Sequence, residues 1–197
     1  MGNQADRSAG GLKPGRLILV KHGQPQIVAD VPRSQWALSE EGREAAVALA
    51  AKLARFEPKA LFASTEVKAY ATALAMGAVL GLPVQGDADL RERRADHNLF
   101  VSPREIDALI ERALRDPDHL VMGEETGASA RARFAAALAR GDTVEDGARV
   151  VVAHGRIISF WLSARLGLDP VSFWRGFGPS SAAVLSEDGR SFEIVTA

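Results

Sequence analysis

Two histidines in this sequence stand at the same kind of position. His22 follows the mainly apolar residues 16–20, His154 follows the mainly apolar residues 149–153, and a glycine comes directly after each histidine. Runs of this kind indicate buried strands of a parallel sheet. A single histidine in a loop is usually only a solvated side chain. The repeated arrangement instead favours a site that contains both histidines, with Gly23 and Gly155 allowing a ligand to approach the backbone closely.

Further ionisable side chains fall at the ends of predicted strands. Lys21 immediately precedes the first of the two histidines. Lys68 lies about one helical turn after the predicted strand 60–64, and Glu92 follows a weaker strand at residues 84–90. Ligands of open parallel sheets bind at the carboxyl ends of the strands. If these strands are neighbours, two histidines, two lysines and a carboxylate therefore project from one edge of the sheet.

Several kinds of catalytic site are excluded by residues that the sequence lacks. There is no cysteine, so thiolate catalysis and thiolate metal sites are absent. No histidines are spaced one helical turn apart and no carboxylate cage occurs, so we expect neither a metal nor another cofactor. The serine elbow GxSxG and the phosphate loops GxxxxGK[ST] and GxGxxG are missing as well. A neutral histidine nucleophile, a carboxylic acid and a cationic pocket for a dianion fit phosphoryl transfer.

Composition limits the compartment and the partners. The formal net charge of −1 argues against nucleic acid as a partner, because neutralising many phosphates requires a basic surface. The longest apolar stretches fall well short of the roughly 20 residues that span a bilayer, so we expect no membrane segment. The lack of cysteine favours a cytoplasmic location. Nothing in the sequence indicates the oligomeric state.

Helical patterns alternate with the predicted strands. Acidic residues start a helix at residues 38–41 that Pro58 ends, and Ser102 with Glu105 forms a capping box for a helix through residue 114. The remaining predicted helices are 66–80, 125–140 and 157–166, and a terminal hairpin is predicted at 182–185 and 192–195. This alternation predicts an α/β three-layer sandwich with a mostly parallel central sheet and helices on both faces. We expect a loose tail at residues 1–15 and a single domain at residues 16–197.

Six short motifs occur in a fixed order along most of the chain. They are LILVKHG at residues 17–23, WALSEEGREAA at 36–46, STEVKAYATA at 64–73, DLRE at 89–92, GEET at 123–126 and VVVAHGRII at 150–158. In sequence and order they resemble the motifs of the histidine phosphatase superfamily, in its phosphoglycerate-mutase-like branch. The domain expected from residue 16 onwards would then be a histidine-phosphatase-like domain.

The resemblance implies a role for each matching residue. His22 would take the phosphoryl group and become a phosphohistidine, while His154 would contact the transferring phosphoryl oxygens. Glu92 would give a proton to the departing alcohol and then help water to attack the intermediate. Gln24, which follows the first glycine, offers an amide hydrogen bond to a phosphate oxygen, although a simple loop residue is an equal interpretation.

Two positions depart from the pattern of the family. Lys21 and Lys68 stand where the family carries phosphate-clamping arginines, and an ammonium is a point charge rather than a planar fork. If each change loses one charged hydrogen bond of about 1.5 to 3 kcal/mol, the rate falls by roughly two to four powers of ten. Such a loss still leaves an enzyme. Nearby arginines that could replace a lost clamp are Arg91, Arg93, Arg94 and Arg156.

Three functions are compatible with these residues. The first is a phosphomonoester hydrolase that acts through His22 on a small phosphorylated substrate. The second is a weak or inactive pseudophosphatase that binds a phosphorylated ligand or a protein partner, which the two lysines favour. The third is a phosphoglycerate mutase, whose bisphosphorylated intermediate is harder to hold without the arginines. Retention of His22, Glu92 and His154 together favours the hydrolase.

Overall fold

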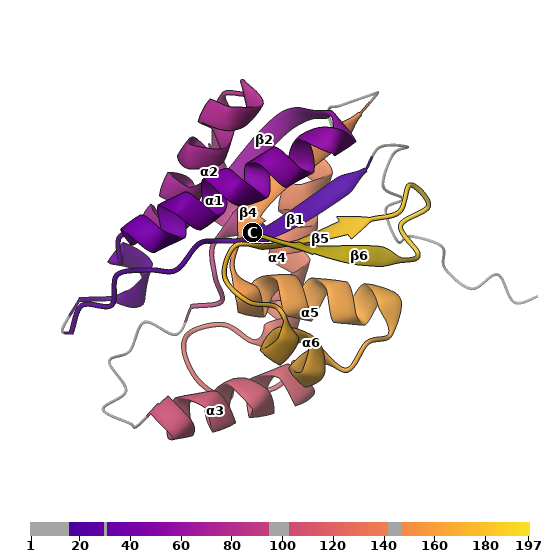
Figure 1. The fold of residues 1–197 in the computed structure, drawn as a ribbon. Helices are drawn as coiled ribbons and strands as arrows, with labels where there is room; N and C mark the ends of the chain where they lie inside the picture. Colours follow the sequence, from indigo (N-terminus) through magenta and orange to yellow (C-terminus); the bar gives the residue numbers. More distant parts are fainter. Residues whose placement is uncertain (1–15, 30, 95–102, 142–146) are drawn as a thin grey trace, which may run out of the picture.

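The centre of the protein is a six-stranded sheet with the strand order β3-β2-β4-β1-β5-β6 (Figure 1). The structure is a computed structural model that describes residues 16–29, 31–94, 103–141 and 147–197. β4 pairs in parallel with β1 and β2, and β2 pairs in parallel with β3. β5 is antiparallel to both β1 and β6. The strands are β1 (Leu17–Lys21), β2 (Pro58–Ser64), β3 (Val84–Asp87), β4 (Ala148–Ala153), β5 (Ser181–Leu185) and β6 (Phe192–Thr196).

Helices cover both faces of this sheet and form two hydrophobic cores. Ile18 and Val20 of β1 belong to the core under α1 (Glu40–Leu53) and α2 (Val67–Leu80). Leu17 and Leu19 belong to the opposite core, under α4 (Gly127–Arg140) and α5 (Gly155–Leu166). Successive side chains of a strand point to opposite faces, so a strand covered on both sides has to be apolar throughout. The predicted three-layer sandwich is thereby confirmed.

Two further helices lie outside α5, at the bottom of Figure 1. α3 (Pro103–Arg115) and α6 (Pro170–Gly176) share a small core with Phe160 of α5. α6 was not predicted from the sequence, although its start carries a recognisable signal. Asp169 is the N-cap residue, whose side chain accepts a hydrogen bond from the N–H of Ser172, and Pro170 is the first residue of the helix. Among the residues that the structure describes, no helix has both the length and the apolar character needed to cross a membrane.

The predicted elements agree with the structure except at some of their ends. The third strand stops at Asp87, and a 3-10 helix at Ala88–Leu90 takes its remaining residues. Pro58 is the first residue of β2, whereas the helix before it already ends at Leu53. The cap predicted at Ser102 and the tail predicted at residues 1–15 lie outside the described residues.

The parallel pairing brings the carboxyl ends of four strands to one edge of the sheet. β1 and β4 run side by side with Lys21 opposite Ala153, and β2 and β3 end with Ser64 opposite Asp87. The backbone N–H of His22 also donates to the carbonyl of Ala153 at 3.0 Å, so the pairing extends one residue beyond β1. The two histidines singled out in the sequence therefore leave adjacent strands at the same edge.

Close backbone packing fixes the loop that follows β1. A Cβ atom on Gly23 would lie 2.6 Å from the carbonyl oxygen of Gly42, and a Cβ on Gly42 would overlap the carbonyl oxygen of Gln24. Ser39 joins the same contact, because its N–H donates to that Gln24 carbonyl at 2.9 Å and its hydroxyl accepts from the N–H of Gly42 at 3.0 Å. The first turn of α1 thus holds the segment that carries His22.

Adding a methyl group at this contact should destabilise the protein. We expect Gly42→Ala to lower the free energy of unfolding by about 2 kcal/mol, because overpacking against backbone forces the loop to shift. Gly176→Ala is the matched control, since a Cβ there meets no atom within 4 Å, and should change it by less than about 0.5 kcal/mol. Urea unfolding of both variants checks this, and equal effects would contradict the proposed role of the contact.

Candidate active site

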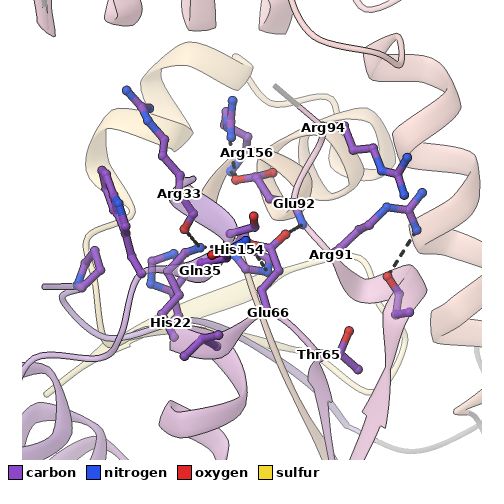
Figure 2. Close-up of a pocket in the computed structure, with 16 residues that line it drawn as sticks. His22, Arg33, Gln35, Thr65, Glu66, Arg91, Glu92, Arg94, His154 and Arg156 are labelled. Atoms are coloured by element: carbon purple, nitrogen blue, oxygen red, sulfur yellow. Dashed lines mark hydrogen bonds and ion pairs between the residues drawn. The ribbon is translucent and has the colours of Figure 1, made fainter. Parts of the chain in front are cut away.

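A cavity of about 580 Å³ opens at the carboxyl ends of the parallel strands. Its lining includes four of the side chains predicted from the sequence, which are His22, Lys68, Glu92 and His154. These residues come from segments that are far apart in the chain, and Figure 2 shows His22, Glu92 and His154 gathered around the same space. The volume lies in the range typical of sites for small molecules.

His22 is held as a neutral imidazole in one tautomer. Its Nδ1 lies 2.8 Å from the carbonyl oxygen of Gly23, and because a carbonyl can only accept, Nδ1 must carry the proton. The lone pair of the ring is then on Nε2. Burial lowers the pKa of His22 well below 6.5, and the nearby charges of Lys68 and Lys21 act in the same direction. At neutral pH His22 therefore has the protonation state of a nucleophile.

His154 is fully buried beside His22. The two rings meet edge to face with their centroids 5.2 Å apart, and His154 Nε2 lies 2.8 Å from the hydroxyl of Ser64 at the end of β2. Burial lowers the pKa of His154, although the carboxylates of Glu66 and Glu92 oppose that effect. His154 in turn lowers the pKa of His22, so the pKa values of both buried histidines lie below 6.5.

Glu92 caps the N-terminus of α5. Its Oε1 accepts hydrogen bonds from the N–H groups of Ile157 at 3.0 Å and Arg93 at 2.9 Å, and its Oε2 accepts from the N–H of Arg156 at 3.1 Å. The Arg156 guanidinium lies 3.2 Å from the same oxygen. Burial alone would raise the pKa of Glu92, but Arg156, His154 and these N–H groups overcome it and hold the pKa at about 2. The carboxylate is thus ionised in the free protein.

Glu66 is a central residue of the site that sequence analysis missed. Its Oε2 lies 2.9 Å from Lys68 Nζ and 3.8 Å from His154 Nε2, and its Oε1 accepts from the N–H of Glu92 at 3.0 Å. Burial opposes ionisation, but His154 and Lys68 lower the pKa of Glu66 overall. The available signal was its position between Ser64 and Lys68 in one motif, because the first turn of a helix places such residues close together.

Lys68 is a buried ammonium with two protein partners. Its Nζ donates to the carbonyl of Arg33 at 2.8 Å and to the carboxylate of Glu66 at 2.9 Å. An ammonium has three N–H donors, so one remains that no residue in the described part of the chain uses. Among the described residues, no group of three or more histidine, aspartate or glutamate side chains is placed to hold a metal ion.

Lys21 does not join the other predicted side chains. Its Nζ donates to the carbonyl of Phe177 at 2.7 Å and faces a second cavity, lined also by Arg104, Asp107 and Trp174. Burial lowers the pKa of Lys21, with Glu92 opposing. Lys21 and His22 are consecutive at the end of a strand, and such neighbours point to opposite sides. That alternation is the reason why the two side chains separate.

The other three residues predicted to bind phosphate, Gln24, Gly23 and Gly155, lie outside the cavity lining. Gln24 is exposed and lies outside the cavity lining. The N–H of Gly23 is already bonded to the hydroxyl of Thr72 at 3.0 Å. Gly155 is the first residue of α5 and packs against Lys21, whose Cε would lie 3.1 Å from an added Cβ. The geometry therefore gives these three residues a supporting position, and their contact with phosphate stays a prediction.

Three of the four candidate replacement arginines reach the cavity. Arg91, Arg94 and Arg156 line it, and each has a carboxylate partner, at 3.2 Å, 3.4 Å and 3.2 Å respectively. Arg93 points elsewhere, because its buried guanidinium donates to the carbonyl of Glu125 at 2.9 Å. Among these three, Arg156 is the one paired with Glu92, which is itself a predicted catalytic residue.

The lowered pKa of His22 predicts how stability depends on pH. Between its folded pKa and 6.5, His22 binds a proton only in the unfolded chain, so the free energy of unfolding falls as the pH drops below 6.5. We expect His22→Gln to remove about 1.4 kcal/mol per pH unit of this slope. Urea unfolding at several values from pH 7.5 to 5 measures it. Parallel curves for the two proteins would contradict a depressed pKa.

Comparison with known proteins gives a consistent result. The histidine phosphatase superfamily (branch 1) matches residues 17–197. The glucosyl-3-phosphoglycerate phosphatase of Mycolicibacterium vanbaalenii is 32% identical over 179 residues, covering 83% of this chain and 79% of that protein. The enzyme of the same name from Mycobacterium tuberculosis is 31% identical over 183 residues, covering 85% and 82%.

A solved structure agrees with these relatives. The mycobacterial glucosyl-3-phosphoglycerate phosphatase complexed with VO3 has a TM-score of 0.68 and 29% identity, and the match covers 92% of this chain and 96% of that one. These relatives are phosphatases, which supports a phosphatase rather than the non-catalytic binding module considered as an alternative. With a family match that spans residues 17–197, the chain belongs to the histidine phosphatase superfamily, branch 1.

Proposed function

We propose that this protein hydrolyses a small phosphomonoester through a phosphohistidine on His22. The observation that carries the proposal is the hydrogen bond from His22 Nδ1 to the Gly23 carbonyl, which leaves a neutral ring with its Nε2 lone pair free. The cavity volume suits a small substrate, and the relatives named above are glucosyl-3-phosphoglycerate phosphatases. We also propose a cytoplasmic location, which the lack of cysteine supports.

The proposed reaction has two steps. In the first step His22 Nε2 attacks phosphorus, and the N–P bond forms as the ester P–O bond breaks. The electron pair of that bond stays on the departing oxygen, which takes a proton from Glu92. In the second step the oxygen of a water molecule attacks phosphorus while the water gives a proton to Glu92. The N–P bond then breaks, which releases inorganic phosphate and returns the lone pair to Nε2.

Substrate binding has to change the protonation of Glu92. In the free protein its pKa of about 2 keeps it ionised, whereas a general acid must carry a proton. A phosphate dianion bound nearby raises this pKa, because like charges disfavour ionisation. The dianion also attracts Arg156 away from the carboxylate. We propose that Glu92 becomes an acid only in the complex with substrate.

Two cations are proposed to hold the phosphoryl group. Lys68 keeps one N–H donor that no described residue uses, and its side chain lines the cavity. Arg156 lines the cavity from the first turn of α5 and offers the planar guanidinium that the two lysines lack. His154, beside the nucleophile, would donate a hydrogen bond to a phosphoryl oxygen. Lys21 would act from a distance through its charge, because its Nζ is bonded to Phe177.

The nucleophile is tested by a change at His22. We expect His22→Ala to lower phosphate release from a panel of phosphomonoesters by at least about 10³-fold and to abolish an acid-labile phosphoenzyme. His119→Ala is the control, since that side chain is exposed and bonded to Asp116. Phosphate release and intact-mass measurement of the phosphoenzyme report the result. Full turnover in the His22 variant would rule out the proposed mechanism.

The proton donor is tested by leaving groups that need a proton to different degrees. We expect Glu92→Gln to lower kcat for glycerol 3-phosphate by about 10² to 10⁴-fold, because an alkoxide must be protonated. The loss with p-nitrophenyl phosphate should be much smaller, since its phenolate leaves without a proton. Glutamine keeps an oxygen that can cap α5.

Glu66→Gln is the matched comparison for this experiment, because Glu66 is the other carboxylate in the cavity lining. We expect this variant to affect both substrates to a similar extent, through Lys68 and His154. If the dependence on the leaving group appeared in the Glu66 variant and not in the Glu92 variant, Glu66 would be the acid and the assignment of Glu92 would fail.

A further inference from the structure

We infer that the cavity contains a second anion site, centred on Arg33, that binds a carboxylate of the substrate other than its reacting phosphate. Arg33 lines the cavity that holds His22 and lies in the 3-10 helix η1 (Arg33–Gln35). The inference rests on the proposed function, because it assigns a substrate class to the same cavity. This residue lies outside the six sequence motifs described above.

Among the described residues that line the cavity, Arg33 is the one cation without an ion pair. Of the five lysine and arginine side chains that line it, four have a carboxylate within 4 Å. These pairs are Lys68 with Glu66, Arg91 with Asp89, Arg94 with Glu124, and Arg156 with Glu92. Within the described part of the chain, the Arg33 guanidinium has neither an ion pair nor a hydrogen bond. Its five N–H donors are therefore available to a ligand.

A second cation lies near this guanidinium. Figure 2 shows Arg33 and Arg156 extending from the site in the same direction. Arg33 is exposed as a whole, but its partial burial lowers the pKa of its guanidinium, the positive charge of Arg156 lowers it further, and Asp107 acts in the opposite direction. Arg156 is thus near enough for its charge to act on Arg33, and an anion at Arg33 would reduce that repulsion. Arg156 is already paired with Glu92 and assigned to the phosphoryl group, so an anionic group bound at Arg33 would lie next to the proposed phosphate position.

The surrounding contacts hold Arg33 in place before any ligand binds. Its carbonyl oxygen accepts from Lys68 Nζ at 2.8 Å, and its guanidinium lies 5.7 Å from the centre of the Trp36 ring. That ring is itself fixed, because its Nε1 donates to the carbonyls of Val28 at 3.1 Å and Val31 at 3.0 Å. Lys68 therefore connects the proposed phosphate position with the second anion site.

The charge of the site favours a carboxylate. The unpaired guanidinium of Arg33 adds one positive charge, which one carboxylate neutralises. The planar guanidinium can also bind both oxygens of that carboxylate. The substrate class is then a small phosphomonoester with a carboxylate. A phosphomonoester of the same size that has no carboxylate would leave Arg33 without a partner, so it should be a poorer substrate.

Two substrates of nearly equal size test the site. 3-Phosphoglycerate has a carboxylate where glycerol 3-phosphate has a hydroxymethyl group. We expect Arg33→Gln to lower the ratio of their kcat/KM values, 3-phosphoglycerate over glycerol 3-phosphate, by about 10- to 100-fold. Arg94→Gln is the matched control, since Arg94 lines the same cavity but is paired with Glu124, and it should leave this ratio within about threefold.

Binding measurements separate this inference from the proposed function. Calorimetric titration of His22→Ala with 3-phosphoglycerate, with and without Arg33→Gln, needs no turnover. Weaker binding in the double variant supports the second anion site even if no phosphomonoester is hydrolysed, in which case only the proposed function fails. An unchanged ratio of kcat/KM values, or equal affinity of the single and double variants for 3-phosphoglycerate, overturns the inference.

Discussion

The hydrogen bond from His22 Nδ1 to the carbonyl of Gly23 is the contact on which the rest of the site depends. It decides which ring nitrogen is free, and the buried position of the ring keeps that nitrogen unprotonated. The carbonyl is held in turn by backbone packing, because Gly23 and Gly42 approach more closely than any side chain would allow. The protonation of His22 thus follows from the way the loop after β1 packs on α1.

Charge in the free protein is balanced inside the cavity. Glu66 lies between Lys68 and His154 and also accepts from the backbone of Glu92. Glu92 then binds Arg156 and caps α5. These contacts join the ends of β2 and β4 with the segment after β3. An incoming phosphate has to compete with Glu66 for Lys68 and with Glu92 for Arg156. Substrate binding is therefore coupled to the protonation of these two carboxylates.

Much of the fold and part of the site follow from local sequence patterns. The apolar run of β1 is buried on both faces, so a parallel central sheet and an edge of polar side chains could be predicted from it. The motif residues His22, Lys68, Glu92 and His154 meet as expected. Lys21 was expected with them, but its position at the end of a strand directs it to Phe177. Strict alternation along the strand would have indicated that separation.

The remaining features depend on contacts between distant segments. Glu66 belongs to the site because its carboxylate reaches the backbone of Glu92, 26 positions away in the sequence. Arg33 reaches the cavity because Lys68 binds its carbonyl and Trp36 supports its guanidinium. No periodicity or capping pattern encodes such tertiary contacts. Arg33 was therefore not among the residues predicted from the sequence to line the site.

Nitrogen-15 NMR of the His22 ring across a pH titration tests the central claim most directly, because chemical shifts distinguish the two tautomers and the charged form. We predict a neutral ring at pH 7 with the proton on Nδ1, and a pKa below the ordinary value of 6.5. A ring protonated on Nε2, or an imidazolium at pH 7, would contradict the account, because neither has a lone pair on Nε2 to attack phosphorus.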